Sequence, residues 1–249
     1  MLVIKVCSER PGIIAERDGG PMKIFGLDLS TRSVAFLLIF SLIGLLLYQV
    51  NYSAIIGVKF DAKFTLFQFI GPMAAGILGP ALGVVSVLLV SLSNFILTGK
   101  ALELPIIVSF FTMAFAAIYF GSKNKATALV AAICMLLFWL NPIGQQAWVY
   151  ALYWLIPIGA TFYKQNIIAR SLGATFTAHA VGSVAYLYAF SIPAASWIGL
   201  LPVVAMERFA FAAGIAVSYC VANTLLQALS TQTDLSFINI EKKYALVKA

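Results

Sequence analysis

Charged residues are scarce in this sequence. Asp, Glu, Lys and Arg make up only 10% of the 249 residues, whereas 62% are hydrophobic. Soluble domains carry about a quarter charged residues, so the composition excludes an ordinary soluble fold. A membrane-spanning helix needs roughly 20 predominantly apolar residues. We therefore predict an all-α, polytopic transmembrane helix bundle, surrounded by a lipid bilayer, with no separate soluble domain.

Histidine and cysteine are also too few to build a metal centre. The chain has one histidine, His179, and three cysteines, Cys7, Cys134 and Cys220, which are far apart and form no CxxC pair. An HExxH-type zinc site needs two histidines, and a disulfide framework needs regularly spaced cysteines. The sequence therefore predicts neither a metal site nor a disulfide framework.

Motifs of several enzyme classes are missing. The sequence contains no Walker A loop, no GxSxG elbow and no pair of aspartates within an apolar segment, so the usual ATPases, serine hydrolases and aspartyl intramembrane proteases are excluded. We expect a protein that is not an enzyme, with no catalytic residue and no cofactor. A Glu207–His179 acid–base couple leaves a membrane-embedded enzyme as an alternative.

An uncharged stretch in the first half of the chain is expected to form the centre of the bundle. Residues 64–95 read FTLFQFIGPMAAGILGPALGVVSVLLVSLSNF, with a Gly79-Pro80 break near the middle. Proline removes a backbone donor and disfavours helix at the preceding residue. We therefore predict two helices, 64–78 and 81–97, folded into a hairpin. Small residues on both sides of the break, such as Ala75 and Gly83, allow close helix packing.

The remaining apolar segments give a count of eight spans, or six to seven if residues 126–163 form a re-entrant hairpin. These segments are residues 33–50, 104–121, 126–140, 147–163, 171–190 and the helix that Pro202 opens. Residues 197–201 are expected to lie at the membrane surface. Basic residues gather at positions 123–125, 164–170 and in the C-terminal tail, so the positive-inside rule places both termini in the cytoplasm.

The same topology accounts for the net charge of +7, so we expect no nucleic-acid partner. The predicted organisation has three parts. Residues 1–21 form a disordered tail, or precede the true start at Met22; residues 22–229 form the bundle in the cell membrane; and residues 230–249 form a basic cytoplasmic tail.

Few polar side chains lie within the predicted spans, and ionisable groups in a membrane usually mark a functional site. They are Gln68, Asn94, His179, Glu207 and Arg208. With the N-terminus inside, these residues are predicted to line one outward-opening pocket for a small molecule. Glu207 or Arg208 would pair with a charged group of the ligand. Alternatively, each polar side chain pairs within the bundle and the protein is a ligand-free scaffold. Tyr186, Tyr188 and Trp197 are expected in an interfacial aromatic belt.

Three stretches resemble a known family. FIGPMAAGILGPALGVVSVLLVSLSNF, with Asn94 near its end, is similar to the second and third helices of S components, the substrate-binding subunits of energy-coupling factor transporters. GATFTAHAVGSVAYLYAF and LPVVAMERFAFAAGIAVSYCVANTLL resemble the closing helices of that family. The resemblance implies capture of a vitamin-like micronutrient on the outer side, together with a transmembrane coupling subunit and separate ATPases. S components typically have six spans, fewer than the eight counted here.

Overall fold

The computed structural model describes residues 22–24, 27–54, 63–99 and 101–246, with backbone only at residues 22–24, 27–29, 53–54 and 63. The predicted tail at residues 1–21 lies outside the described residues. Helices dominate the described part, which agrees with the predicted all-α bundle.

The longer helices are α1 (Thr31–Tyr48), α3 (Pro80–Thr98), α4 (Leu104–Gly121), α8 (Ile167–Ala189) and α10 (Leu201–Leu229). The shorter ones are α2 (Phe67–Leu78), α5 (Ala128–Leu140), α6 (Pro142–Gln146), α7 (Leu155–Ala160) and α9 (Ala194–Gly199). The 3₁₀ turns are η1 (Lys125–Thr127), η2 (Trp148–Trp154), η3 (Thr161–Tyr163) and η4 (Lys242–Tyr244). Two antiparallel pairs join β1 (Met22–Ile24) to β2 (Leu27–Leu29) and β3 (Asn51–Ala54) to β4 (Lys63–Thr65).

Four helices in the described part of the chain are long and apolar enough to cross a membrane: α1, α3, α4 and α10. Their outer faces carry large apolar side chains. On α1, for example, Leu38, Leu42 and Leu46 are 54%, 59% and 63% exposed. An apolar surface of this extent suits contact with lipid. The apolar helices α2 and α5 are shorter, with 12 and 13 residues, so a count of six to eight spans stays a prediction, as does the topology.

The predicted break at Gly79-Pro80 is present. Helix α2 ends at Leu78, and α3 begins with Pro80 at its first position. Gly79 between them has a φ of 83°, and glycine adopts a positive φ without steric cost. The residue types at the break therefore match the geometry of the turn.

Helices α2, α3 and α4 meet at Ala75, which is buried. A Cβ atom added at Gly83 of α3 would lie 2.2 Å from the Cα of Ala75, and one added at Gly121 of α4 would lie 2.5 Å from its carbonyl oxygen. Both glycines are therefore required for backbone contact. Helix α2 also packs against α1 and α10, so the first half of the hairpin lies at the centre of its helix cluster, as predicted.

Residues 147–163 differ from the single span that the hydropathy predicts. They form three short pieces in succession: η2, α7 and η3. Pro157 supplies the physical reason, because its ring would clash with the carbonyl of residue 153 in a continuous helix and it has no N–H to donate. The Pro157 carbonyl accepts a hydrogen bond from the Tyr119 hydroxyl at 2.7 Å, which fixes this segment against α4.

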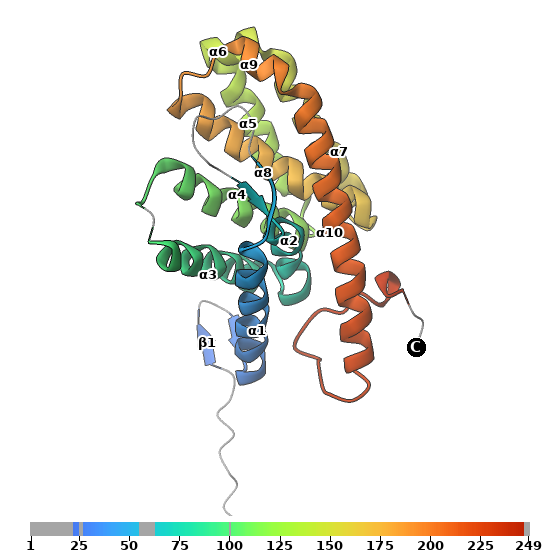
Figure 1. Ribbon diagram of the computed structural model, residues 1–249. Coiled ribbons are helices and arrows are strands. Elements are labelled where there is room, and N and C mark those ends of the chain that lie inside the picture. Colours follow the sequence, from blue (N-terminus) through green and yellow to red (C-terminus); the bar gives the residue numbers. More distant parts are fainter. Residues whose placement is uncertain (1–21, 25–26, 55–62, 100, 247–249) are drawn as a thin grey trace, which may run out of the picture.

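The described core consists of two apolar clusters. The first centres on α2 and includes Phe67 and Tyr219, and the second includes Phe138 and Trp154. In Figure 1, α6 and α9 lie at one end of the molecule, and α10 runs from there toward the opposite end. Helices α4 and α8 pack closely, since a Cβ atom at Gly173 would lie 2.1 Å from the Tyr119 ring. Helix α8 contributes to both clusters, with Ala174 in the first and Phe176 in the second.

After α10 the chain turns back along the bundle (Figure 1). The backbone N–H of Asn239 donates to the Ile77 carbonyl at 2.8 Å, and its side-chain amide donates to the Gly76 carbonyl at 3.0 Å. These bonds satisfy carbonyls at the C-terminal end of α2, which have no partner within the helix. The described part of the predicted tail is thus packed against the helices.

Glu241 in this segment forms a charged junction with two helices. Its Oε1 accepts from Arg170 Nη1 of α8 at 2.6 Å and from the Tyr219 hydroxyl of α10 at 2.9 Å. Burial by itself raises the pKa of Glu241, but the Arg170 hydrogen bond and charge, with help from Tyr219 and Lys243, hold it below its usual value. The ionised carboxylate therefore stabilises the folded state.

Replacing Glu241 with Gln is expected to destabilise the protein at pH 7 by roughly 2 kcal/mol, because Arg170 loses a charged acceptor. The folded-state pKa is depressed, so the contribution of Glu241 is fully present above about pH 4.5 and is lost as pH falls through the lower folded value. Thermal unfolding in detergent from pH 7 to pH 3 should show the wild type and E241Q converging on acidification. A Tm difference independent of pH would contradict this role. Asp234→Asn, which removes an exposed ion pair with Arg32, serves as the control and should cause a much smaller loss of stability at pH 7.

Gly83→Ala is expected to lower the stability by about 2 kcal/mol or more, because the new methyl group forces α2 and α3 apart. Gly199→Ala is a matched control, since a Cβ atom there meets nothing within 4 Å. The measurement is thermal unfolding of both variants in the same detergent. Equal Tm values for the two variants would contradict backbone contact at Ala75.

Candidate functional site

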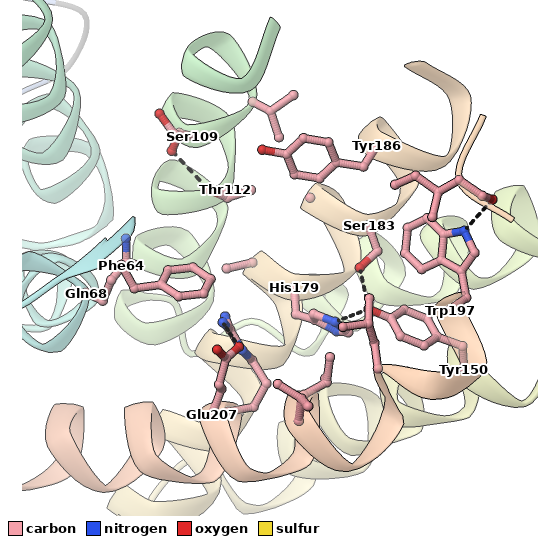
Figure 2. A pocket seen from close by; sticks show the side chains of 18 of the residues that line it. Phe64, Gln68, Ser109, Thr112, Tyr150, His179, Ser183, Tyr186, Trp197 and Glu207 are labelled. Carbon is pink, nitrogen blue, oxygen red and sulfur yellow. Dashed lines mark hydrogen bonds and ion pairs between the residues drawn. The ribbon is translucent and has the colours of Figure 1, made fainter. Parts of the chain in front are cut away.

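A cavity of about 190 Å³ opens where the two apolar clusters meet. Tyr48 on its wall packs against the first cluster, and Tyr150 and Trp197 belong to the second. Side chains reach it from α1, the start of α2, α4, η2, α8, α9 and α10. Figure 2 shows polar groups on α4 and α8 facing aromatic rings from the surrounding elements. The cavity therefore depends on the tertiary packing of segments far apart in the sequence.

Four of the five predicted site residues line this cavity: Gln68, His179, Glu207 and Arg208. Asn94 does not belong to its wall. Its Oδ1 accepts a hydrogen bond from Gln49 Nε2 at 2.9 Å, in an exposed pair that links the ends of α3 and α1. Asn94 lies on the side of α3 that faces the end of α1. Its side chain therefore links two helices, as the scaffold alternative describes.

His179 is held by two aromatic side chains. Its Nε2 lies 2.8 Å from the Tyr150 hydroxyl, and its Nδ1 lies 3.2 Å from Trp154 Nε1. An indole N–H can only donate, so Nδ1 is the acceptor and carries no proton. The ring is therefore neutral, with its proton on Nε2 directed at the Tyr150 oxygen. The predicted role of His179 in a structural hydrogen bond is present, in addition to its position on the cavity wall.

Glu207 and Arg208 form the charged part of the wall. Arg208 Nη2 and Glu207 Oε2 are 3.6 Å apart, with side chains 7% and 13% exposed. The Arg208 Cζ lies 4.8 Å from the centre of the Phe64 ring and 4.5 Å from that of Phe211. Arg208 Nε has no hydrogen-bond partner among the described residues. Aromatic faces and one long ion pair therefore hold this buried cation.

The Glu207–His179 couple proposed from the sequence is not formed in this arrangement. Both ring nitrogens of His179 are engaged by Tyr150 and Trp154. In the described part of the chain, the ion pair of Glu207 is with Arg208. Proton transfer between Glu207 and His179 would therefore require His179 to give up one of its aromatic partners.

Several wall residues were not predicted from the sequence. Tyr150 and Ser183 lie beside His179, and their hydroxyl oxygens are 3.5 Å apart. Trp197 was expected at the membrane interface but is only 3% exposed, because it packs against Tyr150 and Phe138. The dense aromatic run WVYALYW at positions 148–154 was the sequence signal for these contacts.

The fold and the site define a helical protein with membrane-length helices and an internal aromatic cavity that carries one ion pair. The chain is 25% identical over 208 residues to "Uncharacterized protein MJ0923" of Methanocaldococcus jannaschii, covering 75% of this chain and 70% of that protein. No family model matches the chain, and no solved structure matches it. The relative's name states no activity.

Tyr150→Phe is expected to destabilise the protein by about 1–3 kcal/mol, because the buried Nε2–H of His179 loses its acceptor. Tyr188→Phe is the matched control: the Tyr188 side chain is exposed, and its hydroxyl donates to the Leu137 carbonyl. Chemical or thermal unfolding in detergent measures both changes. A smaller loss for Y150F than for Y188F would contradict the assigned hydrogen-bond network.

Proposed function

We propose that this protein is an integral membrane component that binds a small molecule in the central cavity and takes part in its uptake. The observation that carries the proposal is the cavity itself. It joins apolar aromatic walls to a few convergent polar groups, which is the composition typical of small-molecule sites. Its volume of about 190 Å³ exceeds the roughly 150 Å³ that accommodates benzene in an engineered apolar cavity.

The uptake part of the proposal follows the sequence resemblance to S components. A vitamin-like ligand would be captured in the cavity, and a transmembrane coupling subunit with separate ATPases would supply the energy. The absence of a nucleotide-binding motif in this sequence supports an energy source on another chain. Accumulation of the ligand in cells should then depend on this protein and stop when ATP is depleted.

The two alternatives account for less of the site. A ligand-free scaffold explains the Asn94–Gln49 pair and the His179 contacts. It leaves without a role the cavity and Arg208 Nε, which has no hydrogen-bond partner in the described part of the chain. A membrane-embedded enzyme that uses Glu207 and His179 needs a free ring nitrogen, and both are engaged. A binding function gives a role to both the cavity and the Glu207–Arg208 pair.

The proposal predicts thermal stabilisation of the purified protein in detergent by at least one compound from a panel of vitamins, nucleobases and amino acids. A ligand at about 100 times its dissociation constant should add roughly 2.7 kcal/mol to the free energy of unfolding. A panel without any stabilising compound would contradict a binding role and favour the scaffold.

Filling the cavity provides the matched variant. Ala178 of α8 lines the cavity, and Ala185 on the same helix is similarly half-buried but does not line it. Ala178→Leu is expected to abolish stabilisation by the compound that binds the wild type, because the new side chain occupies the empty space. Ala185→Leu should retain it. Equal responses of the two variants would place the ligand elsewhere on the protein.

A further inference from the structure

The most unusual group in the cavity is the Arg208 guanidinium. It has five N–H donors in a planar fork, and its side chain is only 7% exposed. Within the described residues, its one ionic contact is the 3.6 Å approach to Glu207, and Nε has no hydrogen-bond partner. The rings of Phe64 and Phe211 attract the cation through their faces, but they do not replace in-plane oxygen acceptors. A buried charge in this state has unused capacity to bind an oxyanion.

Glu207 is in the complementary state. Its carboxylate lies on the cavity wall, directed toward the space between α4, α8 and α10 (Figure 2). Among the described residues, its ionic partner is Arg208 Nη2. The distance between the two atoms is 3.6 Å, longer than the roughly 2.7–2.9 Å of a good charge-assisted hydrogen bond. The carboxylate therefore has acceptor capacity left for a donor brought by a ligand.

The charges of the described wall residues sum to zero. Arg208 and Glu207 cancel, and the hydrogen bond from Trp154 to Nδ1 keeps His179 neutral. A ligand with a net charge would leave one buried charge without compensation, which is costly in a low-dielectric site. A ligand with one positive and one negative group adds no net charge and pairs with both side chains.

We infer that the cavity binds a small zwitterion of the α-amino-acid type, with its carboxylate on Arg208 and its ammonium group on Glu207. The inference rests on the proposed binding function and specifies the ligand class. The two charged groups of an α-amino acid share one carbon, so they lie roughly 3 Å apart by standard covalent geometry. That spacing matches the 3.6 Å between the Arg208 and Glu207 atoms.

The rest of the cavity suits an apolar side chain of modest size. Tyr150, Tyr186 and Trp197 contribute aromatic surface beyond the charged pair. A volume of about 190 Å³, scaled against the roughly 150 Å³ that holds benzene, corresponds to about eight non-hydrogen atoms. Valine and leucine are near this size, whereas a larger ligand would extend beyond the cavity toward its opening.

The test compares leucine with analogues that lack one charge at a time. Isothermal titration of the detergent-purified full chain would use leucine, 4-methylpentanoate without the ammonium group, 3-methylbutylamine without the carboxylate, and uncharged 4-methylpentanamide. Valine, alanine, phenylalanine and glycine betaine extend the zwitterion set, and uracil represents neutral heteroaromatic ligands. A zwitterion is expected to bind at least 10-fold more tightly than each of its analogues.

Two variants assign the charges. Arg208→Gln should lower the ratio of leucine to 3-methylbutylamine affinity by about 10- to 100-fold, since a hydrogen-bonded charge is lost. Glu207→Gln should lower the ratio of leucine to 4-methylpentanoate affinity in the same way. Each ratio compares two ligands on the same preparation of one variant, so a loss of stability affects both affinities alike and cancels. Arg208→Lys keeps the charge without the planar fork and gives a second measurement if R208Q does not fold.

The outcomes separate the inference from the proposed function. Preferential binding of zwitterions, with each affinity ratio lowered in its own variant, supports both the inference and the proposed binding function. Tight binding of uracil or of a singly charged analogue, with no response to any of the five zwitterions, would overturn the inference and leave the binding function standing. An absence of binding by every probe and by the wider compound panel would overturn both.

Discussion

Backbone contact at Ala75 determines how the helices of this bundle are arranged. Gly83 and Gly121 bring α3 and α4 against the same point of α2, and no larger residue fits at either position. Helices in lipid gain little from the hydrophobic effect, so close van der Waals contact must hold them together. The Gly79-Pro80 turn lies between Ala75 and Gly83 in the sequence and brings them together. The positions of the surrounding helices, including α1 and α10, follow from this arrangement.

The helix ends are stabilised by polar groups from distant parts of the chain. Asn239 binds the last carbonyls of α2, and Arg170 Nε donates to the Phe120 carbonyl at the end of α4 at 2.6 Å. Lys164 binds the carbonyls of Tyr119 and Ser122 nearby. These cations lie at the negative ends of helix dipoles, where positive charge is favourable. The basic residues that indicate topology in the sequence thus also complete the helix termini.

The cavity lies where the two apolar clusters fail to close on each other. Its neutral His179 and its Glu207–Arg208 pair are embedded among aromatic rings. Such groups are costly to bury unless each finds a partner. His179 has two partners, Tyr150 and Trp154, whereas Arg208 Nε has none among the residues that the structure describes. This difference separates the structural polar residues of the bundle from those available to a ligand.

Composition and local residue types were sufficient to predict the helical class, the presence of membrane-length helices and the turn at Gly79-Pro80. These features depend on the hydrophobicity of single segments and on the backbone limits of proline and glycine. The same reasoning predicted four residues of the cavity wall, because polar groups within apolar segments are rare. Asn94, Trp197 and residues 147–163 required the tertiary structure. Their surroundings depend on which helix faces which, on where Pro157 interrupts the helix, and on contacts between residues distant in sequence. Only the fold decides these.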